Sequence, residues 1–326
     1  MSEALVLAVP SKGRLQENAS AFFARAGLPL VRTRGVRDYR GAVAGVPNVE
    51  VLFVSAAEVV TQLASGAAHF GVTGEDLLRE SIPPASGAIE VVTGLGFGHA
   101  NVVVAVPQTW IDVRTMADLD EVAGDLRLRH GRRLRVATKY MNLTRRFFGE
   151  RGIADYRIVE SLGATEAAPA SGTADIIVDI TTSGATLAAN GLKVVEDGIM
   201  LRSEANLIAS LSADWSGPAR ALALRVLARI AAEERARTTR EVRAVLVRDE
   251  PGLAELAERF GATRAAGEGG GGREAVLHCP VATVFELVEA LRGLGAGEVT
   301  VRSLDYVFRG DDPLSARLVA RLEDRP

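Results

Sequence analysis

Residues 4–27 read ALVLAVPSKGRLQENASAFFARAG, and this stretch sets the class of fold. The unbroken apolar run 4–9 predicts a buried strand, because a strand covered on both faces needs no polar positions. The polar turn Ser11–Arg14 follows, and a helix ending near Gly27 comes next. Its apolar residues recur at helical spacing: Leu15, Ala19, Phe22, Phe23 and Ala26.

Short apolar runs and helical patterns alternate along the rest of the chain, which is typical of an α/β fold with a largely parallel sheet. Glycine breaks near residues 94–100 and 190–200 interrupt this alternation. We expect the chain to cross there between two lobes with a cleft between them. The expected first lobe comprises residues 1–98 and 190–238, and the second comprises residues 99–189.

Two segments outside this alternation lead to separate expectations. The charged stretch 109–133 is expected to be irregular. A helix over residues 218–237 leads into a small domain of residues 239–326, where the pattern predicts the order β-α-β-β-α-β.

Composition excludes several classes of function. The chain has 326 residues, of which 48% are hydrophobic, so it can bury a substantial core. A formal net charge of −3 gives no general attraction to nucleic acid or to an anionic membrane. A single cysteine, Cys279, excludes a disulfide within the chain. We see neither a leader segment nor an apolar run of membrane-spanning length, and we expect a cytoplasmic protein.

The segment DIIVDITTSGATL, residues 175–187, carries the strongest chemical signal. An apolar strand ends in Asp179, and a turn of hydroxyl residues with one glycine leads into a helix. Hydroxyl groups and turning backbone N–H groups favour a compact anion such as a monophosphate. The turn has no lysine, so it is not a nucleotide P-loop. The alternative is an ordinary helix cap made by Thr182 or Ser183.

This loop resembles the phosphoribosyl-pyrophosphate loop of ATP phosphoribosyltransferases, and most of the first 215 residues or so share the resemblance. Ser183 stands where that family more often has threonine, which keeps the hydroxyl. Only Asp179 precedes the loop, whereas purine-salvage phosphoribosyltransferases carry two adjacent acids. The further matching segments, in order, are Ser11–Arg14, Gly71–Asp76, Ala137–Tyr140, Glu160–Ser161, Gly163–Glu166, Ala188–Lys193 and Leu201–Ser203.

The resemblance implies a fold and a set of site residues. The fold is a two-lobed, periplasmic-binding-protein-like α/β catalytic domain with a small α+β, ferredoxin- or ACT-like C-terminal domain. Arg14, Lys12 and Asp179 are the implied catalytic residues, with Asp179 on the ribose hydroxyls. The implied phosphoribosyl-pyrophosphate ligands also include Thr181, Thr182, Ser183, Gly184, Ala185 and Thr186. The implied ATP-binding residues are Lys12, Gly13, Arg14, Gly74, Glu75, Asp76, Thr138, Lys139 and Tyr140.

Each of these assignments has a plainer alternative. Lys12 and Arg14 also suit a solvated turn. Glu75 and Asp76 also suit the acidic first turn of a helix. Lys139 also suits a surface position.

The implied reaction transfers the phosphoribosyl group to N1 of ATP and releases pyrophosphate, the first step of histidine biosynthesis. Mg²⁺ is the implied cofactor, carried mostly by the pyrophosphate and with few protein ligands. N1 already bears a lone pair, so the reaction needs no strong general base. Charge neutralisation by Mg²⁺, Lys12 and Arg14 is expected to assist the leaving group.

The C-terminal domain resembles the regulatory domain of the long form of this family, in which histidine binds and inhibits. Residues Asp249–Leu253 also resemble the strand-to-helix turn of ACT domains, whereas Glu268–Arg273 replace a proline-containing segment of the long form. The resemblance implies a homo-oligomer that interconverts between dimers and hexamers, with ATP, phosphoribosyl pyrophosphate and histidine as its small-molecule partners.

Two other classes of protein share parts of this pattern. A prephenate dehydratase-like lyase also joins a two-lobed domain to an ACT domain, but it binds no ribose phosphate. A two-lobed small-ligand-binding protein of the solute-receptor type is a non-enzymatic alternative, which binding of phosphoribosyl pyrophosphate without turnover would favour.

Overall fold

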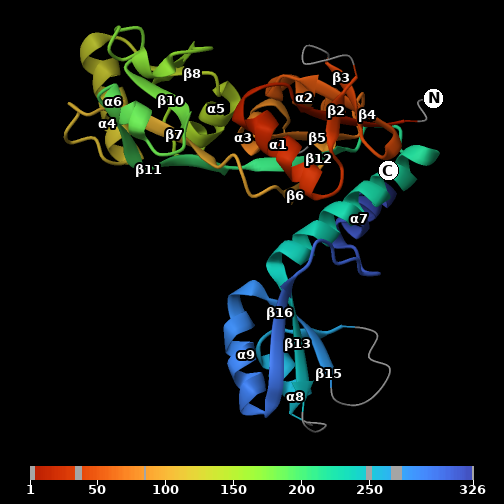
Figure 1. Cartoon of the computed structure of the whole chain (residues 1–326). Helices are drawn as coiled ribbons and strands as arrows, with labels where there is room; N and C mark the ends of the chain where they lie inside the picture. The colour runs from red at the N-terminus through yellow and green to blue at the C-terminus, as the bar shows by residue number, and fades with distance from the viewer. Residues whose placement is uncertain (1–3, 34–38, 84–85, 247–251, 266–273, 325–326) are drawn as a thin grey trace. The chain divides into compact units, whose positions relative to one another are not determined.

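The computed structural model describes residues 4–33, 39–83, 86–246, 252–265 and 274–324 (Figure 1). The chain divides into two compact units, which are described separately. The first unit holds the chain up to Phe22 together with Leu30–Ala219, and the second holds Phe23–Pro29 together with Arg220–Glu323. In the described part, the structure contains no helix that combines the length and the apolar character needed to cross a bilayer.

The first lobe of the first unit is a seven-stranded sheet in the order β2-β3-β4-β1-β5-β12-β6. At its centre, β1 (Leu5–Pro10) pairs in parallel with β4 (Val46–Val54) and with β5 (Phe70–Gly74). All six residues of β1 are buried, as its apolar run predicts. The remaining strands pair antiparallel with their neighbours: β2 (Leu30–Arg32), β3 (Arg40–Val43), β6 (Ile89–Gly94) and β12 (Ala205–Ser210).

Three helices pack against this sheet. α1 (Gly13–Arg25) buries the apolar face that its spacing predicts, except that Leu15 stays partly exposed, and Gly27 follows in the left-handed conformation at φ 69°. α2 (Ala56–Ala64) and α3 (Glu75–Ser81) contribute Val59, Leu63 and Leu78 to one core cluster.

The second lobe is a five-stranded sheet in the order β11-β7-β10-β8-β9. β8 (Leu134–Thr138) pairs in parallel with both β9 (Tyr156–Glu160) and β10 (Ile176–Thr181). Two antiparallel strands, β7 (Ala100–Pro107) and β11 (Leu192–Ser203), complete it. The helical elements of this lobe are α4 (Met116–His130), α5 (Met141–Glu150), α6 (Ala185–Ala189) and the short 3-10 helix η2 (Thr165–Ala167).

Each lobe therefore combines a parallel centre with antiparallel strands, whereas the alternating pattern predicts a largely parallel sheet. Part of the difference arises in the first lobe, where β2, β3 and β4 follow one another without a helix and pair antiparallel. The rest arises near the passages between lobes, from β6 to β7 and back from β11 to β12. A strand that arrives from the other lobe does not follow a crossover helix, so it is free to run antiparallel to its neighbour.

The expectation of irregular structure over residues 109–133 was wrong, because α4 occupies most of that stretch. Its start is a capping box. The Thr115 hydroxyl accepts from Asp118 N, and the Asp118 carboxylate accepts from Thr115 N at 2.7 Å. Gly131, in the left-handed conformation, ends the helix. Reciprocal capping of this kind stabilises the start of a helix, and Met116, Leu119 and Ala123 bury one face of α4 in the core of the lobe.

The second unit contains a four-stranded antiparallel sheet in the order β14-β15-β13-β16. Its chain order, β13-α8-β14-β15-α9-β16, confirms the predicted β-α-β-β-α-β pattern. Residues 249–251 of the ACT-like turn, and residues 268–273, lie outside the described part of the chain. The elements of this unit are α7 (Pro218–Thr238), β13 (Thr239–Leu246), α8 (Leu253–Arg259), β14 (Thr263–Arg264), β15 (Glu274–Pro280), η3 (Val281–Thr283), α9 (Val284–Gly293), β16 (Ala296–Ser303) and α10 (Pro313–Glu323).

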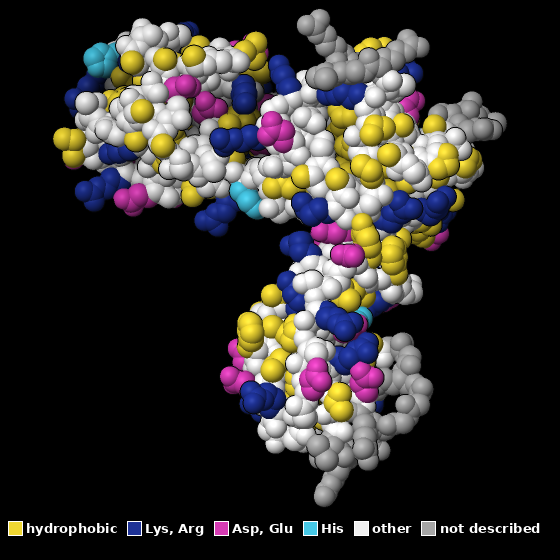
Figure 2. Space-filling model, viewed as in Figure 1, with side chains coloured by type: hydrophobic (Ala, Val, Ile, Leu, Met, Phe, Trp, Pro, Cys, Tyr) yellow, Lys and Arg dark blue, Asp and Glu magenta, His cyan; other side chains and the backbone are white. Residues whose placement is uncertain are grey.

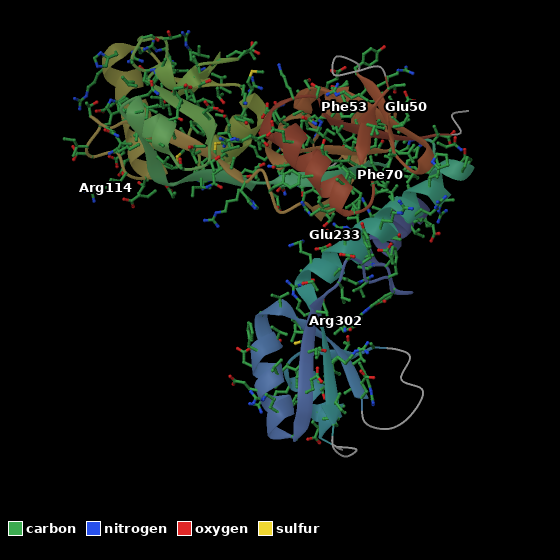
Figure 3. The ribbon with its side chains drawn as sticks, viewed as in Figure 1. Glu50, Phe53, Phe70, Arg114, Glu233 and Arg302 are labelled. Carbon is green, nitrogen blue, oxygen red and sulfur yellow. The ribbon has the colours of Figure 1, made fainter. Side chains whose placement is uncertain are left out.

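Within this unit α7 is held against the end of α1 by polar contacts. Glu233, labelled in Figure 3, is 7% exposed, and its carboxylate accepts from Arg25 at 3.1 Å. Arg229 donates to the carbonyl of Gly27 at 3.0 Å, and the Tyr306 hydroxyl donates to the carbonyl of Arg25 at 2.9 Å. The long helix is therefore a packed element as well as a connector.

Candidate active site

The hydroxyl turn between β10 and α6 is shaped by its own polar groups. Gly184 caps α6 in the left-handed conformation at φ 75°, and its N–H donates to the Thr181 hydroxyl at 2.9 Å. The Ser183 hydroxyl accepts from Ala185 N at 3.4 Å, and the Thr182 hydroxyl donates to the carbonyl of His99 at 3.4 Å. The residue that caps the helix is thus the glycine, so the hydroxyls keep hydrogen-bonding capacity for a ligand.

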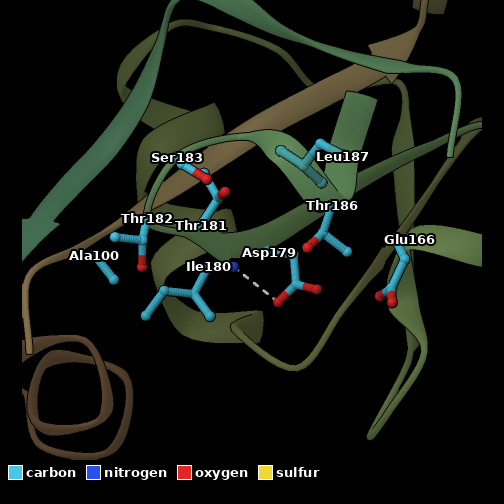
Figure 4. A pocket seen from close by; sticks show the side chains of 9 residues that line it. All are labelled: Ala100, Glu166, Asp179, Ile180, Thr181, Thr182, Ser183, Thr186 and Leu187. Carbon is cyan, nitrogen blue, oxygen red and sulfur yellow. Dashed lines mark hydrogen bonds between the residues drawn. The ribbon is translucent and has the colours of Figure 1, made fainter. Parts of the chain in front are cut away.

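A pocket of about 310 Å³ opens beside this turn (Figure 4). The carboxylate of Glu166 lies across the pocket from Asp179 and from the Thr186 hydroxyl. All of the lining residues belong to the second lobe: Ala100, Glu166, Asp179, Ile180, Thr181, Thr182, Ser183, Thr186 and Leu187. The structure therefore brings Asp179 and most of the predicted phosphate loop to one cavity.

Asp179 sits in an environment that disfavours its charge. Burial raises the pKa of its carboxyl, and Glu166 raises it further. A hydrogen bond from Ile180 N at 2.8 Å and the positive charge of Lys139 act in the opposite direction, but the net pKa is raised. Lys139 is within electrostatic reach because β8, which it follows, pairs in parallel with β10. A cation or a hydroxyl donor that enters the pocket would stabilise the charged form of this carboxylate.

Glu166 lines the pocket after a tight bend, whereas from the sequence it was expected mainly as a charge at a helix start, with a site role as the weaker alternative. Ala164 adopts a left-handed conformation at φ 50°, which is uncommon for a residue other than glycine. The hydroxyls of Ser161 and Thr165 share a hydrogen bond of 3.0 Å that closes the bend. The only sequence signal is the segment Gly163–Glu166 in the family resemblance.

The basic turn after β1 lies in the first lobe. Lys12, Gly13 and Arg14 are exposed, and Gly13 is left-handed at φ 75°. Within the described part of the chain, neither Lys12 nor Arg14 has a hydrogen bond or ion pair. The turn therefore presents two uncompensated positive charges to solvent.

Arg32 is a neighbour of this turn that the sequence analysis did not identify. Its guanidinium donates to the carbonyl of Ser11 at 2.9 Å and stacks on the ring of Phe53 at 4.0 Å (Phe53 is labelled in Figure 3). Arg32 thus supports the basic turn from β2. Because β2 reaches the turn only through sheet pairing, no local sequence pattern signals the contact.

The other predicted ATP-binding residues fall into two groups. Glu75 accepts from Arg79 at 2.6 Å on the surface of α3, and Lys139 is exposed. Asp76, Thr138 and Tyr140 are buried at 6%, 0% and 0% exposure. A Cβ at Gly74 would collide with the Asp76 carboxylate, so a larger residue there would displace Asp76. A contact between ATP and the buried residues stays a prediction.

The site also has basic side chains nearby and carboxylates that could bind a metal ion. Figure 2 shows lysine and arginine side chains near the place where the two lobes of the first unit meet. The described residues contain no cluster of three or more His, Cys, Asp or Glu side chains that could hold a metal ion. Asp179 and Glu166 together offer the pocket a pair of carboxylates.

Comparisons with known proteins agree on one family. The family model described as ATP phosphoribosyltransferase matches residues 55–231. ATP phosphoribosyltransferases from Afipia carboxidovorans and from Rhodopseudomonas palustris strain HaA2 are 58% and 59% identical to this chain, each over 99% of both sequences. A solved ATP phosphoribosyl transferase (HisG:HisZ) complex from Thermotoga maritima is 24% identical, with a TM-score of 0.54. It covers 69% of this chain and 95% of its own, and shares the fold of that part.

Proposed function

The chain belongs to the ATP phosphoribosyltransferase family, and we propose on that premise how its residues carry out the transfer. The enzyme is a pentosyltransferase of the first step of histidine biosynthesis. It joins the phosphoribosyl group of phosphoribosyl pyrophosphate to N1 of ATP and releases pyrophosphate. We place the reaction in the cytoplasm.

The donor binds in the pocket at the end of β10. Thr181–Thr186 receive the 5-phosphate through their hydroxyl and backbone donors. Asp179 and Glu166, on opposite sides of the pocket, accept hydrogen bonds from the ribose hydroxyls. The observation that carries this proposal is that the hydroxyl turn and both carboxylates line one cavity (Figure 4).

Positive charge assists departure of pyrophosphate. Lys12 and Arg14 are exposed without a partner in the described chain, and they bind phosphate oxygens of the pyrophosphate or of ATP. Lys139 adds charge from the second lobe. Fixed charges aimed at a leaving anion stabilise the transition state, because they need no rearrangement during the reaction.

Mg²⁺ fits this site as an ion carried by phosphate oxygens. Carboxylates are suitable ligands for it, and Asp179 and Glu166 are the residues placed to share it with the substrate. When bound, Mg²⁺ supplies positive charge to the phosphates. The protein orients the two substrates, and N1 needs no base to become nucleophilic.

Product analysis tests the proposed basic turn. The purified full chain with ATP, phosphoribosyl pyrophosphate and Mg²⁺ should release pyrophosphate and form a product with the mass of phosphoribosyl-ATP.

Arg14→Ala should lower kcat/KM by roughly tenfold to hundredfold, the effect of one hydrogen bond to a charged group, and should leave the melting temperature nearly unchanged. Arg133→Ala, an exposed arginine after α4, is the matched control. Near-normal turnover by Arg14→Ala would remove that residue from the mechanism.

The second unit is the proposed regulatory domain. Its β-α-β-β-α-β order supports histidine as a feedback inhibitor, and we propose a homo-oligomer of dimers and hexamers. Adding histidine during turnover, with the mass of the oligomer followed by light scattering, tests both proposals. Full activity at saturating histidine would contradict the regulatory role.

A further inference from the structure

A buried polar network joins the two lobes of the first unit. The Tyr140 hydroxyl, just before α5 in the second lobe, donates to Asp76 Oδ2 on α3 of the first lobe at 2.7 Å. The Ser203 hydroxyl donates to Asp76 Oδ1 at 3.0 Å and accepts from Asp76 N at 3.1 Å. Ser203 is the last residue of β11, where the chain returns to the first lobe. We refer to Asp76, Tyr140 and Ser203 as the interlobe network.

The hydrogen bonds of this network are strong because water is excluded from them. None of the three residues is more than 6% exposed. Burial raises the pKa of Tyr140 far above its ordinary value, and the Asp76 carboxylate raises it further, so the phenol stays protonated and donates. A hydrogen bond to a buried carboxylate is worth more than one between neutral groups.

A second carboxylate from the first lobe caps the same helix of the second lobe. Glu80 of α3 accepts from Asn142 N at 2.9 Å and from Leu143 N at 2.9 Å, so it binds two first-turn donors of α5. The residue that begins this helix, Tyr140, makes no side-chain cap of its own. Leu77, between the two acids on α3, packs against core clusters of both lobes. The start of α5 is therefore fixed by the first lobe.

The network also borders the proposed active site. Lys139 precedes Tyr140, and its Nζ lies 4.9 Å from the centre of the Tyr140 ring. The same lysine lowers the pKa of Asp179 in the donor pocket. The interlobe network therefore adjoins a residue whose charge acts on the donor pocket.

We propose that the interlobe network sets the distance between the donor pocket and the basic turn, so that Asp76, Tyr140 and Ser203 are positioning residues for the transfer. This inference rests on the proposed function, which puts the donor in the second lobe and the phosphate-binding Lys12 and Arg14 in the first. Two substrates held on separate lobes react only when those lobes keep a defined separation, and a displacement of about 1 Å can cost a hundredfold in rate.

The test uses Tyr140→Phe and Ser203→Ala in the full-length enzyme, each of which removes one hydroxyl. The control is Tyr156→Phe in the same lobe, because the Tyr156 hydroxyl has no hydrogen bond within the described residues while its ring packs on Phe148. Steady-state rates give kcat and KM for both substrates. Calorimetry with ribose 5-phosphate reports on the donor pocket alone.

Both network variants should lose tenfold or more in kcat, because a displacement of about 1 Å between the lobes can cost about a hundredfold in rate. Their KM values and their affinity for ribose 5-phosphate should stay within twofold of the unmodified enzyme. Tyr156→Phe should match the unmodified enzyme throughout.

Two results would overturn the proposal. A raised KM for ATP with an unchanged kcat would mean that Tyr140 contacts ATP itself. Unchanged kinetics in both variants would make the network purely structural. Failure of the proposed donor site looks different, because ribose 5-phosphate would then not bind even to the unmodified enzyme.

Discussion

The segment Asp175–Thr181, which comprises β10 and the residue before it, carries two aspartates in contrasting surroundings. At its start, Asp175 accepts from Arg132 at 2.7 Å and from Arg135 at 2.9 Å. Burial raises the pKa of Asp175, but these bonds outweigh burial and hold the pKa at about 2. Near its other end, Asp179 has no arginine partner in the described chain, and burial raises its pKa.

The contrast distinguishes Asp175, a carboxylate that stabilises the fold, from Asp179, a carboxylate available to a ligand. Asp175 already has the partners that favour its charge, so it joins β10 to β8 and stabilises the fold. Asp179 has only the Ile180 N–H and the charge of Lys139 to offset its burial, so a ligand donor that enters the pocket would favour its charge further. Replacing each aspartate tests this division of roles directly.

The largest effect is expected from Asp179→Asn. If Asp179 accepts from two ribose hydroxyls as proposed, loss of the carboxylate should lower kcat/KM by roughly a hundredfold, since each hydrogen bond to a charged group is worth about tenfold or more. The melting temperature should stay the same or rise, because an unfavourable charge is removed. Steady-state kinetics and thermal unfolding measure both, with the exposed Asp120→Asn as control. A strongly destabilised variant would contradict the proposed role.

Asp175→Ala should instead lower stability and leave activity nearly unchanged. The backbone N–H and guanidinium of Arg135 would lose their acceptor, which should lower the free energy of unfolding by about 1–3 kcal/mol. The kcat/KM of the folded fraction should change less than threefold. Urea denaturation and steady-state assays give the two quantities. A large loss of activity at full stability would assign Asp175 to the site.

The pH dependence of stability should differ between the two positions. Since the folded pKa of Asp175 is depressed to about 2, its stabilisation is complete above pH 4 and is lost as the pH falls through about 2. Since the folded pKa of Asp179 is raised, its contribution is present below its ordinary pKa and is lost as the pH rises through the folded value. Melting temperatures measured from pH 2 to 7 check this. Compared with the unmodified chain, the melting temperature of Asp175→Asn should depend less on pH between about 2 and 4, and that of Asp179→Asn should depend less on pH above 4.

The smallest effect is expected at the loop glycine. Gly184→Ala should destabilise the chain by about 1–2 kcal/mol, because φ 75° is strained for alanine. It should also weaken binding of ribose 5-phosphate, measured by calorimetry. Gly124→Ala, inside α4, is the matched control, since a Cβ there meets no atom within 4 Å. That change should stabilise the chain by about 0.5–1 kcal/mol. Equal changes in the free energy of unfolding at both glycines would mean that the left-handed conformation at position 184 does not disfavour alanine.

Local patterns were enough to predict several elements of this fold. The apolar run of β1, the amphipathic face of α1 and the β-α-β-β-α-β order of the second unit all follow from spacing along the chain. The helix α4 was missed because its few apolar residues stand among many charged ones, although Met116, Leu119 and Ala123 are buried and the Thr115–Asp118 capping box fixes its start. The antiparallel strands were missed because β2 and β3 connect without a crossover helix, and because β7 and β12 enter their sheets from the other lobe.

The sequence by itself determined the α/β class, the hydroxyl turn that follows Asp179 and, through resemblance, the family. These are properties of consecutive residues, and consecutive residues are neighbours in any fold. Only the tertiary structure decided which polar groups are paired. Asp76 meets Tyr140 across 64 positions, and Asp175 meets Arg135 across 40. A carboxylate is structural or available to a ligand according to its burial and its partners, and folding sets both.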